Sequence, residues 1–423
     1  MTSRERLAAA LNHQPPDRVP VDLGGTPVTG IAAGVLSPLR VALGLDQPGD
    51  RVKIVEPYQI LGEVTDDLRE ALGIDTVGLD GPRNMFGYEN ADWKPWELPD
   101  GTPVLVPGKF NTVPERNGDL LMYPQGDKSA PASGRLPAGG YYFDAIIRQR
   151  PIKEDELDPR DNVEEYTHIE DEGAAWFGEQ AERLAAGPYG VVFNPGGMGI
   201  GDIALVPAPG LKRPRGLRDV EEWYVSLVSR RSYILEVFER QCEIALQNLA
   251  HLAREVGDRV QVLFVTGTDF GTQRGPFLSV ATYRDLYQPF HRILNDWVHH
   301  NTAWKTFMHT CGGVEPLLEE FIAAGFDILN PVQCSAEGME PGHLKRTYGE
   351  RLVFWGGAVD TQKTLPFGTP AEVKREVLGR LEVFAPGGGY VFNAIHNLQP
   401  RTPVENVLAM FEAYREFHGL ASR

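Results

Sequence analysis

The feature that most constrains the fold is a regular alternation of short apolar runs with longer stretches of helical period, beginning near residue 188. The runs that predict strands are rich in Val, Ile and Phe: YGVVFN, VQVLFV, WKTFM, DILNP, LVFW and YVFN. Helices are predicted between and after them, at 223–256, 279–301, 314–324, 341–348, 370–384 and 403–417. Because strands that alternate with helices pair in parallel through right-handed crossovers, this pattern predicts a parallel α/β sheet.

The number of strand–helix units predicts which parallel fold this is. Six units lie after residue 188, and IDTVGLD at 74–80, preceded by a predicted helix over 54–72, supplies a seventh. An eighth is expected in the middle region. A chain of 423 residues is long for one ordinary domain but suits a barrel that carries insertions. The sequence therefore predicts a (β/α)₈ TIM barrel that spans residues 1–423 as a single domain.

Local signals mark three helix ends. TPAE at 369–372 and TPVE at 402–405 each place Thr before a Pro and a Glu three positions later, which predicts a capping box at each helix start. Gly325, in AAGFD, suits the left-handed position that ends a helix.

Residues 81–160 interrupt the alternation. They are rich in Pro, Gly and aromatic residues, and PDGT is a turn signal between short strands. We expect a β-rich insertion over the carboxyl-end face of the barrel, not an independent domain. Its aromatic residues are expected to give the pocket an apolar wall: Trp93, Trp96, Tyr141, Tyr142 and Phe143.

Composition excludes several classes of partner. The net charge of −17 argues against nucleic acid and anionic membrane surfaces, since nothing would offset phosphate repulsion. The apolar runs are far shorter than the ~20 residues that span a bilayer. Three cysteines (Cys242, Cys311 and Cys334) are too few for a disulfide framework, which favours the cytoplasm.

Polar residues closely follow six consecutive predicted strands. In a parallel barrel the carboxyl ends of the strands form the face that carries the active site, so these side chains are expected on one rim. We take Asn194, Gln333 and Asp360 as candidate substrate-binding residues and Asp269 as a candidate catalytic residue that could act as a base or orient the substrate. His309 with Cys311, and His396, complete the set.

His309 and Cys311 form a candidate metal pair. Residues two apart at a strand exit point the same way, so an imidazole and a thiolate there can reach one ion. The alternative is a capped strand end with a small buried thiol. His396 is predicted to reach the same rim, where it is either the third metal ligand or an acid/base group.

Four segments of the chain are similar to the uroporphyrinogen decarboxylase superfamily. They are RERLAAALNHQPPDRVPVDLGG, HTCGGVEPLLEEFIAAGFDILNPVQ, FWGGAVDTQ and GGGYVFNAIHNLQPRTPVENV. The resemblance covers nearly the whole chain, is most specific in the last 130 or so residues, and implies a (β/α)₈ barrel. It also implies one of two chemistries, metal-free uroporphyrinogen decarboxylation or zinc-dependent methyl transfer to or from a corrinoid.

The matching residues favour the methyltransferase branch. His309-Thr310-Cys311 matches the His-x-Cys zinc pair of that branch, whose third ligand is usually a Cys shortly before a Thr-Pro; here that position holds His396. The decarboxylases also carry a His at this place, but their arginine-rich substrate clamp has no counterpart in VPVDLGGTPVTG, which contains no arginine.

The expected function is therefore a zinc-dependent methyltransferase that moves a methyl group between a small substrate and a corrinoid on a partner protein. The small methylated substrate would be, for example, a methoxylated aromatic, a methylated amine or a methylated thiol. Zn²⁺ would be held by His309, Cys311 and His396. The alternatives are a metal-free lyase that uses His396 and Asp269 on a carboxylated substrate, and a non-catalytic binding barrel. A second copy of the chain is a further expected partner.

Overall fold

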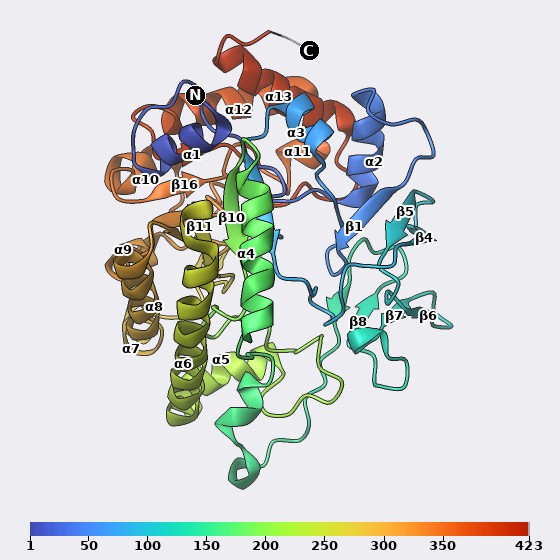
Figure 1. Ribbon diagram of the computed structural model, residues 1–423, viewed down its shortest axis with the longest axis vertical. Helices are drawn as coiled ribbons and strands as arrows, with labels where there is room; N and C mark the ends of the chain where they lie inside the picture. The colour runs from blue at the N-terminus through green and yellow to red at the C-terminus, as the bar shows by residue number, and fades with distance from the viewer. Residues whose placement is uncertain (422–423) are drawn as a thin grey trace.

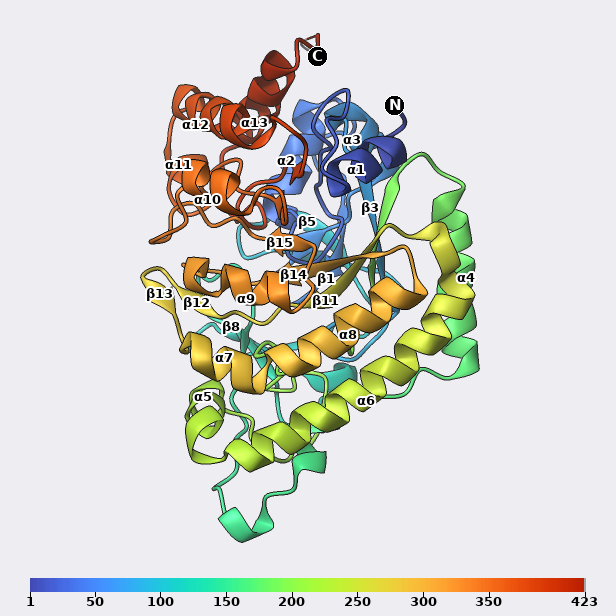
Figure 2. The same ribbon diagram turned by 90° about the vertical axis from the view of Figure 1, so that its left-hand side faces the viewer.

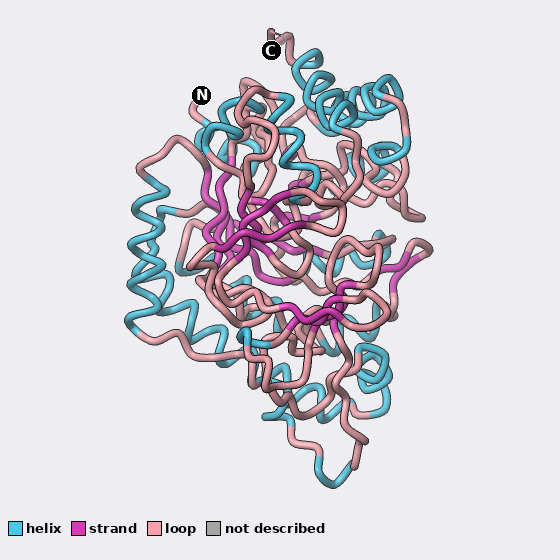
Figure 3. The backbone as a smooth tube through the Cα atoms, turned by 90° about the vertical axis from the view of Figure 1, so that its right-hand side faces the viewer, coloured by secondary structure: helices cyan, strands magenta, loops and turns pink. Residues whose placement is uncertain are grey.

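The computed structural model describes residues 1–421. Within them, the central element is a curled, seven-stranded sheet whose strands all pair in parallel, in the order β17-β16-β15-β14-β11-β10-β3. The strands gather at the centre of the fold and the helices surround them (Figure 3). Their bounds are β3 Thr76–Asp80, β10 Gly190–Asn194, β11 Val262–Thr266, β14 Lys305–His309, β15 Ile328–Asn330, β16 Val353–Trp355 and β17 Tyr390–Val391.

A short N-terminal segment closes the sheet into a barrel. The amide of Asp22 donates to the carbonyl of Phe392, just after β17, and the amide of Asp75, just before β3, donates to the carbonyl of Val21. The segment thus bridges the two edge strands. We expected the eighth strand in the middle region, and this prediction was wrong: residues 20–22 occupy the eighth position instead. The segment PVDLGG that contains them is too short and too rich in Gly to show a strand pattern in the sequence.

The helices lie around this sheet, and several follow the predicted strand–helix order. Figures 1 and 2 show α4, α6 and α8 stacked along one flank, and both chain termini at the same end. Their bounds are α1 Ser3–Leu11, α2 Ala33–Ala42, α3 Asp66–Leu72, α4 Asp171–Ala185, α5 Val220–Ser229, α6 Arg231–Val256, α7 Val280–Leu286, α8 Gln288–Asn301, α9 Leu318–Ala323, α10 Pro341–Tyr348, α11 Thr364–Phe367, α12 Pro370–Phe384 and α13 Val404–Phe417.

The barrel has its own apolar interior, separate from the larger core between sheet and helices. Val192, Phe307, Ile328 and Val353 form one buried cluster with Leu7 of α1. Helix α1 also contacts β3, β10 and β17. It therefore plugs one end of the barrel, the amino-terminal end, and leaves the carboxyl ends of the strands for the site.

The helix-end predictions had mixed outcomes. Thr369 caps α12 in the predicted capping box with Glu372, and Gly325 adopts the left-handed conformation, with φ of 85°, after α9. The second capping box was wrong: Thr402 donates its hydroxyl to the carbonyl of Gln399, so it does not accept a hydrogen bond from α13.

The predicted helix over 54–72 was wrong in its first half. Strands β1 (Val52–Glu56) and β2 (Leu61–Gly62) occupy that half, and only α3 is helical. Pro57 interrupts the helical period, and the branched residues before it favour a strand. The predicted helices over 223–256 and 279–301 are each divided in two, at Arg230 and at Tyr287.

The middle region is rich in antiparallel strands, as predicted. Strands β4 (Lys94–Glu97) and β5 (Pro103–Val106) join β1 and β2 in a four-stranded sheet. A second antiparallel sheet contains β6 Thr112–Pro114, β7 Leu120–Met122, β8 Gly134–Leu136 and β9 Asp144–Ala145. Since β5 pairs with β1, the region is continuous with the N-terminal part of the chain.

Candidate metal centre

His309 is the last residue of β14 and faces the barrel interior. It lies two residues after Phe307, which belongs to the interior cluster, and alternate residues of a strand share a face. Its Nδ1 lies 2.6 Å from Oδ1 of Asn330 on the neighbouring strand, whose amide group donates to the carbonyl of Trp355. Because Asn330 must therefore accept, His309 carries its proton on Nδ1, and the lone pair of Nε2 is free.

Cys311 follows β14 on a tightly packed turn. Its Sγ lies 3.5 Å from Nε2 of His309, and its amide donates to Oδ1 of Asp269 at 2.6 Å. The next residue, Gly312, has a φ of 95°, and a Cβ there would lie 2.3 Å from the backbone of Gly271. The glycine after Cys311 thus lets the loops after β11 and β14 touch, which sets Asp269 against the cysteine.

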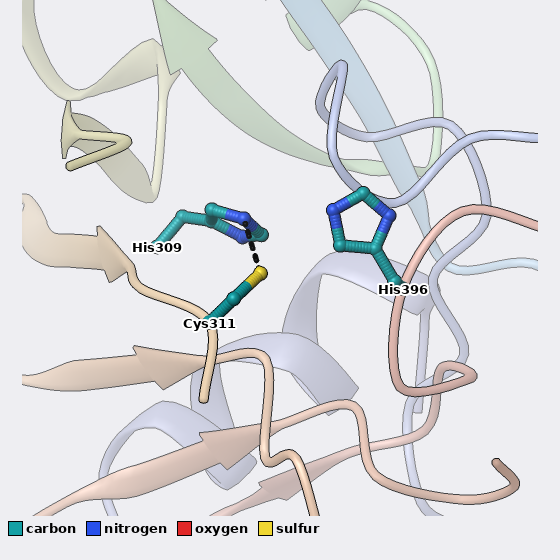
Figure 4. Close-up of side chains that lie close together, drawn as sticks. All are labelled: His309, Cys311 and His396. Carbon is teal, nitrogen blue, oxygen red and sulfur yellow. Dashed lines mark hydrogen bonds between the residues drawn. The ribbon is translucent and has the colours of Figure 1, made fainter. Parts of the chain in front are cut away.

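His396, five residues after β17, completes the cluster. One ligand atom from each of His309, Cys311 and His396 lies within 4.8 Å of the others. The rings of the two histidines are 5.2 Å apart between centroids, at 72° to one another. Figure 4 shows one nitrogen of His396 facing the pair and the other turned away. The three residues, 87 positions apart at the extremes, therefore converge as the sequence predicted.

The donor set fits a tetrahedral metal ion. Bonds of ~2.0–2.1 Å to nitrogen and ~2.3 Å to sulfur place neighbouring ligand atoms roughly 3.5 Å apart, which is the distance between Cys311 and His309. Burial lowers the pKa of His309 to about 4, although the hydrogen bond that its ring donates to Asn330 acts in the opposite direction. Burial and the neighbouring His309 lower the pKa of His396 to about 3. Both imidazoles are therefore neutral at pH 7, the form that binds a metal.

Cys311 and Asp269 influence each other directly. Burial, and then the charge of Asp269, raise the pKa of the Cys311 thiol well above its usual range. Burial likewise raises the pKa of Asp269, although the amide of Cys311 hydrogen-bonds to its carboxylate. A bound cation would reverse this unfavourable pairing, because a coordinated thiol is deprotonated outright.

The other residues singled out in the sequence have different surroundings. Gln333 accepts the amide of Gly312 at 2.7 Å, so it supports the turn that carries Cys311. Asn194 donates to Oδ1 of Asp80 at 2.9 Å on the neighbouring barrel strand. Asp360 is buried and accepts the amides of Gln362 and Lys363, so its carboxylate caps its own loop. Within residues 1–421 no hydrogen bond links Asp360 to the cluster.

Three polar residues of the barrel mouth, two at strand ends and one in a loop, were missed in the sequence. They are Asn330 and Asp80, the last residues of β15 and β3, and Asp202, which accepts the amide of Gly267 at 3.2 Å. The period-two pattern would have found Asn330, since Ile328 faces the barrel interior. No comparable signal marks Asp202, which lies in an irregular loop.

The mouth of the barrel is acidic. Burial raises the pKa of Asp80 and of Asp202 to about 6 and that of Glu56, at the end of β1, to about 7. In the described part of the chain, no lysine or arginine is among the charged neighbours that shift these pKa values. Asp80 still touches solvent, but the surrounding protein removes enough water from its carboxylate to raise its pKa.

The raised pKa of Glu56 predicts a pH-dependent stability. Its folded-state pKa of about 7 exceeds the ordinary value of 4.5, so the folded state binds the proton of Glu56 more tightly than the unfolded state does. The stability that this proton contributes is complete below pH 4.5 and is lost as pH rises through 7. From pH 5 to pH 8 the free energy of unfolding of the parent should therefore fall by about 2 kcal/mol more than that of the Glu56→Gln variant. Urea unfolding at both pH values measures this. Glu179→Gln, at an exposed position, is the control. Equal pH dependence of stability in the parent and in Glu56→Gln would contradict the prediction.

Comparison with known proteins finds a family match in the C-terminal half of the chain. Residues 218–417 match the model of the family described as uroporphyrinogen decarboxylase (URO-D). Uroporphyrinogen decarboxylases from three strains of Coxiella burnetii are 30% identical over 88 residues, 20% of this chain and 24% of theirs. The chain thus aligns with about a quarter of the length of these curated relatives. The resemblance to the URO-D superfamily is confirmed.

A solved structure supports the same fold. A methyltransferase from Methanosarcina mazei superposes over 99% of this chain and 99% of its own, with a TM-score of 0.54 and 15% sequence identity. At this identity the likeness concerns the fold, which is that of a TIM barrel. Separately, none of the helices within residues 1–421 is long and apolar enough to cross a membrane.

Proposed function

We propose that this protein is a zinc-dependent methyltransferase that moves a methyl group between a small methylated substrate and a corrinoid held by a partner protein. The observation that carries the proposal is the convergence of His309, Cys311 and His396, two neutral imidazoles and a thiol, within 4.8 Å on one rim. The superposition on a solved methyltransferase supports the reaction class.

In this proposal His309, Cys311 and His396 would hold Zn²⁺, which would supply Lewis acidity toward the heteroatom of the substrate. Asn330 fixes the ring and tautomer of His309. Asp269 holds the Cys311 turn by its backbone amide and orients the substrate or moves a proton. Asn194 and Gln333 act from the rim, where each is fixed by a hydrogen bond.

We also propose that residues 81–160 are an insertion over the carboxyl-end face of a single barrel domain. Tyr142, Phe143 and Asp144 support this, because they line one cavity together with His396. In this arrangement the aromatic residues shield the substrate from water, and the rest of the mouth admits the corrinoid.

A metal-free lyase is the second candidate, favoured by the sequence match to uroporphyrinogen decarboxylases and by the proximity of His396 to Asp269. The acidic mouth counts against it. Glu56, Asp80 and Asp202 would repel a polycarboxylated tetrapyrrole, and residues 20–31 offer no arginine to bind its carboxylates.

Metal analysis combined with a methylation assay tests the proposal. The purified full chain is expected to contain about one zinc per molecule and to methylate free cob(I)alamin from a panel of methoxylated, N-methylated and S-methylated compounds. Loss of the cobalt(I) absorption band reports transfer. Removal of zinc with a chelator should abolish transfer, and zinc alone should restore it. A zinc-free protein that decarboxylates a carboxylated substrate would instead support the lyase.

A further inference from the structure

A cavity of about 270 Å³ is lined in part by His396, which is also one of the three residues of the candidate metal cluster. Its wall includes three aromatic side chains and one carboxylate, Tyr58, Tyr142, Phe143 and Asp144. No lysine or arginine is among its lining residues in the part of the chain that the structure describes. Its volume is at the small end of ligand pockets, typically ~300–1,000 Å³, and suits a compact molecule.

Two carboxylates lie at this cavity, and a guanidinium, that of Arg401, follows the lining residue Pro400 and lies against the ring of Tyr141. Asp144 lies on the wall and is exposed. Glu56 lies behind the wall, where its carboxylate accepts the amides of Tyr58 and Gln59 at 3.0 and 2.7 Å. The pKa of Tyr58 is raised by burial and also by the charges of Asp144 and Glu56. The cavity wall thus combines aromatic faces with a carboxylate and contains no basic side chain among its described lining residues, an environment that favours a cation.

His396 supplies an independent sign of a ligand. It lines the cavity, and its Nδ1 is buried without a hydrogen-bond partner in the described residues. An unpaired buried polar atom of this kind costs about 1–3 kcal/mol unless a ligand or water satisfies it. In Figure 4 one ring nitrogen faces the metal cluster and the other faces away from it. A ligand oxygen close to a cationic group would satisfy this second nitrogen.

We propose that the cavity formed by Tyr58, Tyr142, Phe143 and Asp144 binds an ammonium group, and that the small substrate of this protein is therefore an organic cation. That the cavity binds a cation does not depend on the proposed function; that this cation is the substrate rests on it. His396 belongs both to the cavity wall and to the metal cluster, so the methylated heteroatom can lie at the cluster while the ammonium group lies in the cavity. The neighbouring Tyr141 already holds a cation, with the Arg401 guanidinium 4.7 Å from its ring centroid.

Three probes separate charge from shape. Choline carries a quaternary ammonium and a hydroxyl, tetramethylammonium carries the charge alone, and 3,3-dimethylbutan-1-ol is the uncharged isostere of choline. Isothermal titration calorimetry with the full chain is expected to give saturable binding of choline, with a Kd at least about 10-fold below that of the neutral alcohol. Tetramethylammonium should bind more weakly than choline, because it cannot satisfy His396.

Variants place the binding in this cavity. Asp144→Asn and Tyr142→Leu each alter an exposed side chain and should raise the Kd of choline about 10-fold. Asp155→Asn, an exposed aspartate outside the cavity, should leave it unchanged. The proposal is overturned if the neutral alcohol binds as tightly as choline, if neither cation binds saturably, or if the cavity variants bind choline like the parent.

The two proposals fail separately. Cation binding is read at equilibrium, without corrinoid or turnover, so it can persist in a protein that lacks zinc or transfers no methyl group. Conversely, zinc-dependent methyl transfer from a neutral methoxylated compound, together with equal binding of choline and its isostere, would sustain the proposed function and refute the cationic substrate.

Discussion

Cys311→Ser is expected to remove most of the zinc from the protein and to leave the barrel folded. The thiolate is the soft ligand of the set, and serine supplies a weaker oxygen ligand at the same place. Substitution of a residue that only hydrogen-bonds to a metal ligand typically lowers metal affinity about 10–100-fold. Loss of a direct ligand should therefore weaken zinc binding by more than about 100-fold. Elemental analysis after gel filtration, and competition with a zinc-binding dye, measure this directly.

Cys334→Ser is the matched control. Cys334 is a half-buried thiol on the loop after β15, and its Sγ donates to the carbonyl of Gly357 at 4.0 Å. It should retain zinc at the level of the parent. Circular dichroism should show both variants folded, because the Cys311 side chain adds little to the apolar interior. A Cys311→Ser protein with undiminished zinc would contradict a site built on His309, Cys311 and His396.

The barrel and its site were predictable where short-range patterns decide the structure. The strands after residue 188 are buried on both faces and read as continuous apolar runs, so composition alone marks them. The alternation of side chains then places His309 on the same face as Phe307, toward the interior. The helix α12 begins at its capping box because the Thr and Glu that form it are adjacent in the chain.

Long-range packing decided what could not be predicted. Residues 20–22 close the barrel through hydrogen bonds to Phe392 and Asp75, yet nothing in PVDLGG indicates a strand. Thr402 fits the capping pattern, but its hydroxyl bonds to Gln399 because of the turn that precedes α13. The acidic character of the mouth was also invisible, since Glu56, Asp80 and Asp202 are scattered in sequence. Their pKa values are raised by burial first, and for Glu56 and Asp202 also by a neighbouring aspartate, both of which arise only on folding.

Substitutions of His396 distinguish the two proposed chemistries. As a zinc ligand, His396 should be replaceable by Cys, the residue that the methyltransferase branch usually carries at this position. His396→Ala is then expected to lose zinc and to lower methyl transfer at least about 100-fold, since Lewis-acid stabilisation is worth several kcal/mol. His396→Cys should retain zinc and a larger share of the activity than His396→Ala.

As an acid/base group in a lyase, His396 would behave differently. Neither Ala nor Cys would replace an imidazole that moves a proton, and activity would fall equally in both variants whether or not zinc is bound. Zinc content and rate should therefore be measured on the same preparations, with the exposed His300→Ala as the control for loss of a histidine. Rates that follow zinc content across parent, Cys and Ala variants would assign His396 to the metal. Equal loss of rate in Ala and Cys variants that keep different amounts of zinc would assign His396 to proton transfer. The loss of the imidazole, which both variants share, would then account for the lost rate, and the zinc content would not.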